Sequence, residues 1–193
     1  MKKNNGLKNL ILILIMVGLA VGYYFYLANR DVEEEPAETK VTKTQEVLLR
    51  DMEKNYPPSP KEVIKYYAEI SKCFYDGDYS EEEFLKLADR ARDMYDDELK
   101  ATQTEEEYLK DLRDDIKEFK DNDTVISSFK TSVSTDVQYS TSEKGEMAVL
   151  YCMFNLRQGT KMQTSNHKFV LRKDAEEHWK ILGWELDNGN SNK

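Results

Sequence analysis

Any catalysis or metal binding that requires histidine would have to use His167 or His178, because these are the only two histidines of the chain. Catalytic triads and most zinc sites need such a residue. His178 follows Glu176 and Glu177 in a predicted turn, where we expect a solvated imidazole. His167 lies in the middle of a predicted strand, on the face that it shares with Phe169. We expect an ordinary strand residue there, and a ring directed into a pocket is the alternative.

The two cysteines, Cys73 and Cys152, are too few for a disulfide scaffold or a multi-cysteine zinc module. Cys73 belongs to a predicted helix and Cys152 to a predicted strand. We expect two small buried hydrophobic residues. A disulfide between them is the alternative, since an external location would permit one. Nothing in the sequence places a histidine beside Cys73, so a nucleophilic thiol has no support.

The acidic motif Asp76-Gly77-Asp78-Tyr79-Ser80 begins like the calcium loop of an EF-hand. That loop requires glycine at its sixth position and glutamate at its twelfth, where this chain has Glu81 and Leu87. Helix capping explains these acids better. We therefore predict no metal site, no cofactor and no catalytic set.

The elements that would position these residues follow a long uncharged run. Residues 10–28 contain no charged side chain, and as a helix they would span about 28 Å, close to the hydrocarbon thickness of a bilayer. Lysines precede the run, and acidic residues dominate after it. The positive side predicts a cytoplasmic segment at 1–9, a single transmembrane helix at 10–28 and an extracytoplasmic remainder. A cleaved secretory signal is the alternative.

The charge balance becomes more acidic once this run is set apart. The whole chain carries −9, with 28 basic and 37 acidic residues. Because Lys2, Lys3 and Lys8 precede the run and all acids follow it, 25 basic residues remain and the external part carries about −12. An acidic chain without a basic block is not expected to bind nucleic acid. The 11% aromatic content, with twelve tyrosines, indicates a packed core.

The external part reads as a stalk at 29–59, a domain at 60–187 and a polar tail at 188–193. A thin apolar stripe allows a short helix over 44–55 within the stalk. In the domain, apolar residues recur at helical spacing in three segments. Each segment starts with a capping residue and has glutamate three positions later. The three pairs are Ser59 with Glu62, Ser80 with Glu83 and Thr104 with Glu107.

From Val125 the apolar period changes from 3.6 to 2. The alternation of Val125, Phe129, Val133, Val137 and Tyr139 with polar residues predicts one long strand with one wet face. Apolar runs at 147–156, 162–172 and 179–186, separated by turns, predict three more strands. Helices followed by a meander of antiparallel strands indicate an α+β domain.

The order of these features resembles the NTF2-like, or cystatin-like, superfamily. The resemblance is carried by the opening at residues 60–67, the helix break at Gly77-Asp78, and the closing Trp179-Lys180-Ile181 with Trp184. It implies a cone of about three helices packed on a curved four-stranded antiparallel sheet. Residues 50–63, 72–75 and 96–99 also look like those of an uncharacterised family of membrane-anchored clostridial proteins.

Enzymes of the resembled superfamily use an aspartate base and a tyrosine acid inside the cone. Here the strand face expected to point inward offers Phe129, Val133 and Val137, and no aspartate falls clearly on a buried face. The first helix offers Tyr66 and Tyr67. This pattern speaks against isomerase-type catalysis.

We therefore expect a membrane-anchored extracytoplasmic protein, a non-catalytic interaction or assembly module of the cell envelope that binds a partner protein or another copy of itself. The alternative is an NTF2-like pocket that binds or transforms a small molecule. The candidate lining residues of that pocket are Tyr67, Cys73 and His167. A deep cavity with convergent polar groups would favour the alternative, and a cone filled with aromatic side chains would oppose it.

Overall fold

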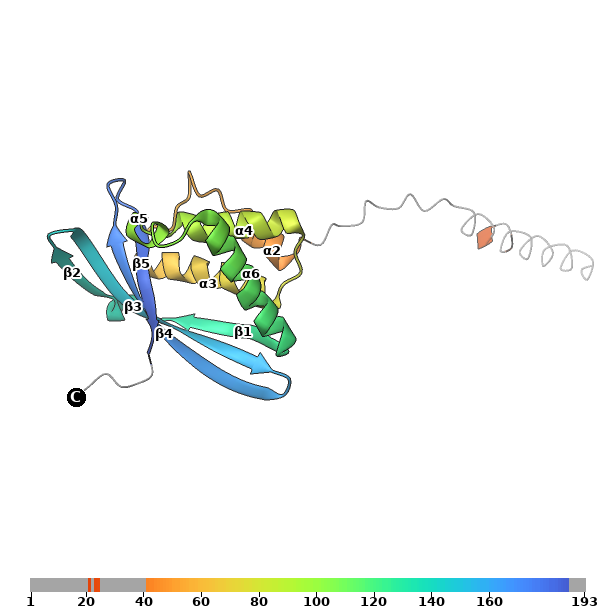
Figure 1. Cartoon of the computed structure of the whole chain (residues 1–193). Helices are drawn as coiled ribbons and strands as arrows, with labels where there is room; N and C mark the ends of the chain where they lie inside the picture. Colours follow the sequence, from red (N-terminus) through yellow and green to blue (C-terminus); the bar gives the residue numbers. More distant parts are fainter. Residues whose placement is uncertain (1–20, 22, 25–40, 188–193) are drawn as a thin grey trace, which may run out of the picture. The chain divides into compact units, whose positions relative to one another are not determined.

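The computed structural model describes residues 21, 23–24 and 41–187. The chain divides into two compact units, Met1–Lys40 and Val41–Lys193, and every labelled helix and strand in Figure 1 belongs to the second. Residues 1–9, the tail at 188–193 and all but three residues of the predicted membrane helix lie outside the described residues. Within the described ranges, no helix has both the length and the apolar character to cross a bilayer.

The second unit is α+β, as the sequence predicts. Its described part has the helices α2 (Lys43–Leu48), α3 (Pro60–Asp76), α4 (Glu81–Asp93), α5 (Asp97–Lys100) and α6 (Glu105–Asp121). The strands are β1 (Thr124–Thr131), β2 (Gln138–Ser142), β3 (Gly145–Gln158), β4 (Lys161–Lys173) and β5 (Trp179–Leu186). They form one antiparallel sheet in the order β1-β3-β4-β5, with β2 also paired to β3.

The three long helices begin at their predicted caps. The Ser80 and Thr104 hydroxyls each accept a hydrogen bond from the backbone N–H three residues on, and the glutamate there accepts the cap residue's own N–H. At Ser59 only the first of these two bonds forms. Because four N–H groups at a helix start lack partners within the helix, these side chains fix where each helix begins.

Two short helices accompany the three long ones: α2 lies where the sequence allowed a short helix in the stalk, and α5 was not predicted. Helix α4 ends at Asp93 because the next residues pair with β5 instead. The Ile181 N–H donates to the Met94 carbonyl at 2.7 Å, and the Asp96 N–H donates to the Ile181 carbonyl at 2.8 Å. The Asp96 side chain then caps α5 by accepting the Glu98 N–H.

Residues 41–59, expected in the stalk, pack on the domain. Thr44 is 1% exposed, and its hydroxyl donates to the Asp78 carbonyl at 3.1 Å. The Tyr66 hydroxyl donates to the Val47 carbonyl at 2.9 Å. At the far end of the segment, the Tyr56 hydroxyl donates to the Trp179 carbonyl at 2.9 Å. The folded unit therefore begins at Val41 rather than at residue 60.

The sheet has five strands rather than four, because the long strand expected from Val125 to Tyr139 is broken. β1 pairs with the second half of β3 and β2 with the first half. Between them, Ser134–Asp136 forms a 3₁₀ turn. Serine, threonine and aspartate side chains favour such turns over a ladder. The predicted strand would place Val133 and Val137 on the same face. At the break this pattern fails, since Val133 is 51% exposed whereas Val137 is buried.

Two bulges interrupt the ladders: Ser127 is an extra residue in β1, and Leu182 is an extra residue in β5, opposite Val170 and Leu171 of β4. Bulges bend a strand and increase its twist. The first bulge is held by Lys72 of α3, whose ammonium donates to the carbonyls of Ile126 at 2.9 Å and Ser127 at 2.8 Å. Helix α3 is thereby fixed to β1, beside which it lies in Figure 1.

The core lies between α3, α4 and one face of the sheet. Alternate residues of β3 are buried, as a strand with one packed face requires. The apolar stripe of α3 is buried against them. The largest fully buried side chains of this core include Tyr66, Ile64, Ile70, Leu87, Met94, Leu150, Phe169, Leu171 and Ile181.

A buried ion pair joins the α4–α5 corner to the sheet. Asp96 is 5% exposed and accepts two hydrogen bonds from the Arg172 guanidinium, one of them from Nε at 2.9 Å. Arg172 also donates to Glu98 at 2.9 Å. The pair corrects the expectation that no aspartate would be buried. A bidentate pair of this kind compensates the buried charges and also fixes the relative orientation of the two side chains.

Substituting Thr44→Val tests whether residues 41–59 belong to the cooperative unit. The Asp78 carbonyl would lose its buried donor, so we expect a loss of about 1–2 kcal/mol in the free energy of unfolding. Urea unfolding of the full chain in a nonionic maltoside detergent measures it. Leu49→Ala, at a side chain 75% exposed, is the control and should change little. Equal stabilities for the wild type and Thr44→Val would place this segment outside the cooperative fold.

Substituting Asp96→Ala tests the corner ion pair. Removing one partner leaves the Arg172 guanidinium largely buried without its main acceptor, so we expect a loss of about 3 kcal/mol by the same unfolding measurement. The control is Glu98→Gln, which removes a charge that is 53% exposed and should cost below about 1 kcal/mol. Similar losses for the two variants would show that burial of the pair does not matter.

Candidate functional site

A cavity of about 740 Å³ lies between the sheet and helices α3 and α6. Its walls come from α3, the α4–α5 corner, α6, and the inner faces of β1, β3, β4 and β5. This volume falls within the usual range of small-molecule sites, about 300–1,000 Å³. The bent sheet and α6 therefore enclose space that the core does not fill.

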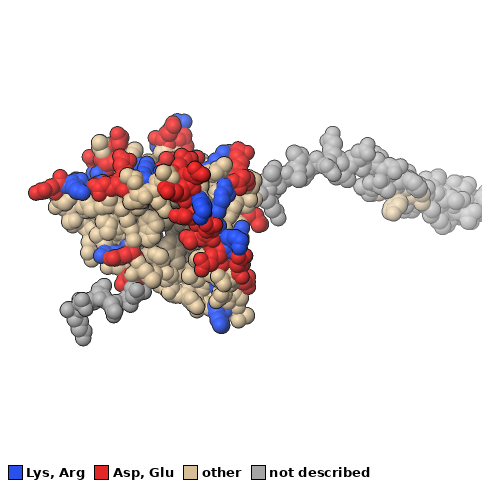
Figure 2. Space-filling view, viewed as in Figure 1, with Lys and Arg blue, Asp and Glu red and all other residues tan. Residues whose placement is uncertain are grey.

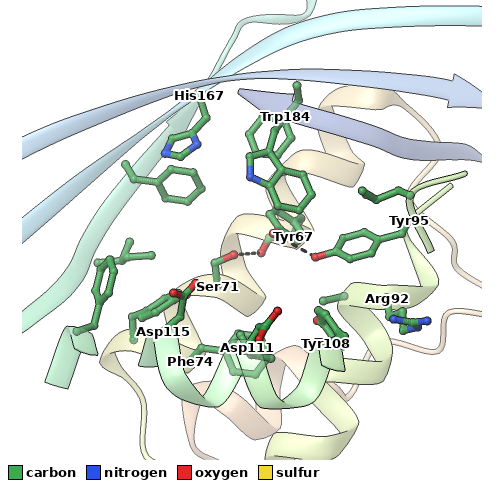
Figure 3. A pocket seen from close by; sticks show the side chains of 18 of the residues that line it. Tyr67, Ser71, Phe74, Arg92, Tyr95, Tyr108, Asp111, Asp115, His167 and Trp184 are labelled. Atoms are coloured by element: carbon green, nitrogen blue, oxygen red, sulfur yellow. Dashed lines mark hydrogen bonds between the residues drawn. The ribbon is translucent and has the colours of Figure 1, made fainter. Parts of the chain in front are cut away.

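One wall of the cavity is aromatic (Figure 3). The Tyr67 ring centroid lies 5.8 Å from that of Phe169, 5.9 Å from Trp184 and 6.1 Å from Tyr95. Tyr95 in turn lies 6.0 Å from Tyr108. These spacings are typical of interacting aromatic pairs. The rings support one another along one side, and the space beside them stays open.

Two tyrosine hydroxyls and two serines give this wall polar groups. The hydroxyl oxygens of Tyr67 and Tyr95 are 3.4 Å apart, and the Ser71 hydroxyl donates to the Tyr67 carbonyl at 2.9 Å. Burial raises the pKa of both tyrosines, so both are neutral at pH 7. Ser165 Oγ lies 2.9 Å from His167 Nε2. Burial lowers the pKa of His167, which favours the uncharged imidazole.

The opposite wall is one face of α6, and it is acidic. Tyr108, Leu112 and Phe119 line the cavity at helical spacing, and Asp111 and Asp115 lie on the same face. Figure 3 shows both carboxylates on the α6 side, across from Tyr67 and Trp184. The cavity thus has the rings of Tyr67, Phe169 and Trp184 on one side and three α6 carboxylates, those of Asp111, Asp114 and Asp115, on the other.

The basic residues of α6 are used elsewhere. Lys110 pairs with Asp114 at 2.7 Å, Lys117 with Asp121 at 2.5 Å, and Arg113 with Glu81 of α4 at 2.5 Å. Exposed pairs of this kind contribute little stability, but they occupy the cations. They leave the cavity face of the helix with acidic residues and no lysine or arginine of its own.

Among the described residues, neither Asp111 nor Asp115 forms an ion pair, although the charge of Lys110, which pairs with Asp114, also acts on Asp111. Asp111 accepts a hydrogen bond from the neutral Gln103 amide at 2.8 Å. The side-chain carboxylate of Asp115 has neither a hydrogen bond nor an ion pair with any described residue. Partial burial raises the pKa of Asp115, and the negative charges of Glu118, Asp111 and Asp114 raise it further. At Asp115, which is exposed overall, the cavity wall thus holds a negative charge that no ion pair of the described residues neutralises.

Of the described residues, Arg92 is the one arginine that lines the cavity, and no lysine lines it. Its guanidinium lies 5.5 Å from the Tyr108 ring centroid and donates to the carbonyls of Lys100 and Gln103. In Figure 3 it lies at the other end of the α6 face from Asp115. Backbone carbonyls, rather than the cavity carboxylates, hold this cation.

Figure 2 shows that acidic side chains gather over the helical part of the domain, whereas the part formed by the sheet is mostly uncharged. The first turns of α4 and α6 supply three glutamates each. Clustered charge of one sign raises the local concentration of opposite ions near a cleft. The field around the cavity therefore favours cations over anions.

The structure brings together two of the three pocket residues expected from the sequence. Tyr67 and His167 both line the cavity. Cys73 of α3 does not: it lines a separate, smaller groove between α3 and α2, as Phe129 also does. Burial raises the pKa of Cys73, and it raises that of Cys152 to about 12. Both are buried free thiols, so the alternative of a disulfide is not realised.

Sequence analysis did not single out Asp111 and Asp115, because acidic residues on a helix usually face solvent, and both are indeed exposed while they also line the cavity. The signal was present, since both residues fall at helical spacing between Tyr108 and Phe119. The side chain of His178, expected to be solvated, is 41% exposed, and its ring also stacks on Tyr56 with the ring centroids 4.2 Å apart. In the described part of the chain, no three histidine, cysteine or acidic residues are grouped so as to hold a metal ion.

Comparison with known proteins places the chain in a family. The model of a domain of unknown function (DUF6715) matches residues 1–184, so the chain belongs to that family. No curated protein matches the sequence.

The unneutralised charge of Asp115 predicts a stabilising effect of Asp115→Asn. A raised pKa means that folding disfavours the ionised carboxyl, so the variant should unfold at a slightly higher temperature than the wild type at pH 7, by about 1 °C after solvent screening. The difference should shrink as the pH falls below 4, since both side chains are then neutral. Thermal unfolding followed by circular dichroism measures it.

Asp114→Asn is the matched control, because Asp114 is the neighbouring acid but pairs with Lys110. This variant should not gain stability at pH 7. If Asp115→Asn were destabilising at pH 7 while Asp114→Asn was neutral, Asp115 would have a stabilising partner and the account of its charge would be wrong.

Proposed function

We propose that this protein is a membrane-anchored, extracytoplasmic domain that binds a small amphipathic molecule and does not transform it. The observation that carries the proposal is the cavity of about 740 Å³, with an aromatic wall and polar groups that converge on one space. A module that acts only through its outer surface has no need of such a space. The cavity therefore favours the small-molecule alternative over a purely protein-binding role.

The anchor and the fold family belong to the same proposal. The uncharged run at 10–28, preceded by lysines and followed by acids, supports a transmembrane segment with the domain outside the cytoplasm. The NTF2-like likeness is supported by helices packed against one face of a bent antiparallel sheet that meets them around a cavity (Figure 1). In that arrangement the cavity opens in the compartment outside the membrane.

Binding is better supported than catalysis. Ser165 and His167 are within hydrogen-bond distance, which is the first requirement of a nucleophile–base pair. However, no carboxylate among the described residues bonds to the other ring nitrogen of His167, so nothing orients it as a base. The two tyrosine hydroxyls pair with each other. These groups are suited to fixing the orientation of a ligand.

Fluorescence of Trp184 tests the proposal directly. A Trp179→Phe background leaves Trp184 as the single tryptophan, and its ring lies in the cavity wall. The full chain in a nonionic maltoside detergent is titrated with 3-phenyl-1-propanol, a neutral amphipathic probe. We expect a saturable change with a dissociation constant on the order of 1 mM or tighter, as a ligand of this size allows.

A cavity-filling variant decides whether the probe enters the cavity. Ser71→Phe places a ring in the space, so saturable binding should be lost, whereas Ser140→Phe on exposed β2 should bind as before. Circular dichroism must show that both variants are folded, and Leu112→Phe on α6 replaces Ser71→Phe if the latter is not. Unchanged binding in a folded cavity-filled variant, or no saturable change in the parent, would contradict the proposal.

A further inference from the structure

We infer that the cavity selects organic cations: its ligand carries an ammonium group, placed between the aromatic wall and the Asp111 and Asp115 carboxylates, on an apolar body. This inference rests on the proposed binding function and names its ligand class. Two independent features of the cavity support it, the aromatic faces and the two carboxylates, which form no ion pair with the described residues.

The aromatic wall is the first feature. Ammonium groups are attracted to the faces of tryptophan and tyrosine rings within about 6 Å, and more strongly where water is excluded. Tyr67, Tyr95 and Trp184 form a mutually packed set, with Trp184 also 5.8 Å from Tyr95. Trp184 is 42% exposed, so its ring keeps surface available to a ligand. Such a set is also a hydrophobic surface for the ligand's body.

The carboxylates are the second feature. Asp111 has a neutral amide as its hydrogen-bond donor, and Asp115 has no donor among the described residues. The charges that act on Asp115 from α6 are those of the acids Glu118, Asp111 and Asp114, so they repel the Asp115 carboxylate rather than neutralise it. Burial raises the pKa of Tyr67 and of Tyr75. The negative charge of Asp115 raises both pKa values further, so it acts on the aromatic side of the cavity. A cation between the two walls would neutralise this charge.

The remaining lining groups are consistent with a cationic ligand. Burial keeps His167 uncharged at neutral pH, so it adds no repulsion. Arg92 is held by backbone carbonyls at the opposite end of the α6 face from Asp115, which leaves the Asp115 end free of competing positive charge (Figure 3). An anionic ligand, by contrast, would meet three α6 carboxylates and an acidic outer surface over the helices.

Three probes with the same phenylpropyl body test the charge preference with the Trp184 reporter and the full chain. They are trimethyl(3-phenylpropyl)ammonium, its neutral isostere with carbon in place of nitrogen, and 4-phenylbutyrate. We expect the cation to bind at least about tenfold more tightly than the neutral isostere, and the anion more weakly than either. Measuring in 0.5 M NaCl screens the outer acidic surface, so a preference that persists there comes from inside the cavity.

Neutralising Asp111 and Asp115 tests whether these two carboxylates cause the preference for the cationic probe. Asp111→Asn and Asp115→Asn should each weaken binding of the ammonium probe about tenfold and leave binding of the neutral isostere unchanged. Glu106→Gln, which removes one charge of α6 away from the cavity, is the control and should leave all three affinities unchanged.

The outcomes separate the two proposals. If none of the three probes gives a saturable signal, the binding function itself fails. If the neutral isostere or the anion binds as tightly as the cation, or if the asparagine variants leave cation binding unchanged, the binding function stands and selection of cations is overturned.

Discussion

The tie between the α4–α5 corner and the sheet determines the arrangement around the cavity. The Asp96–Arg172 pair and the backbone bonds between Met94, Asp96 and Ile181 stop α4 and fix the corner against β4 and β5. Tyr95, between the bonded residues, is thereby held against Tyr67 and Trp184. Because one end of the helical layer is fixed here and Lys72 fixes α3 to the β1 bulge, the sheet curves away from the helices between these points.

Helix α6 covers the space left by this curvature without filling it. Only Tyr108 and Ile116 of its residues are buried, whereas α3 buries eight. A helix with so narrow an apolar face can present acidic residues toward a cavity, where partial burial and the neighbouring acids raise the pKa of Asp115 and so disfavour its charge. A positively charged ligand would offset this effect. The same arrangement therefore explains an open cavity, its acidic wall and the proposed preference for cations.

The sequence predicted the parts of the fold that local signals specify. Capping residues marked the starts of α3, α4 and α6, and periodicity separated helices from strands. Prediction from the sequence failed where contacts between residues far apart in the chain determine the structure. The break at Ser134 depends on β3 being long enough to pair with two strands, and the burial of Thr44 depends on the carbonyl of Asp78. In the same way, Asp96 is buried only because Arg172 lies beside it, and Asp115 faces a cavity only because α6 covers a bent sheet.

A crystal structure of the full chain bound to trimethyl(3-phenylpropyl)ammonium tests the central claim most directly. The account predicts that the probe occupies the cavity between α6 and the sheet, with its nitrogen within about 6 Å of the Tyr67, Tyr95 or Trp184 ring centroid and facing Asp111 and Asp115. A structure in which α6 closes onto the sheet and leaves no cavity, or in which the probe binds only outside it, would contradict the account.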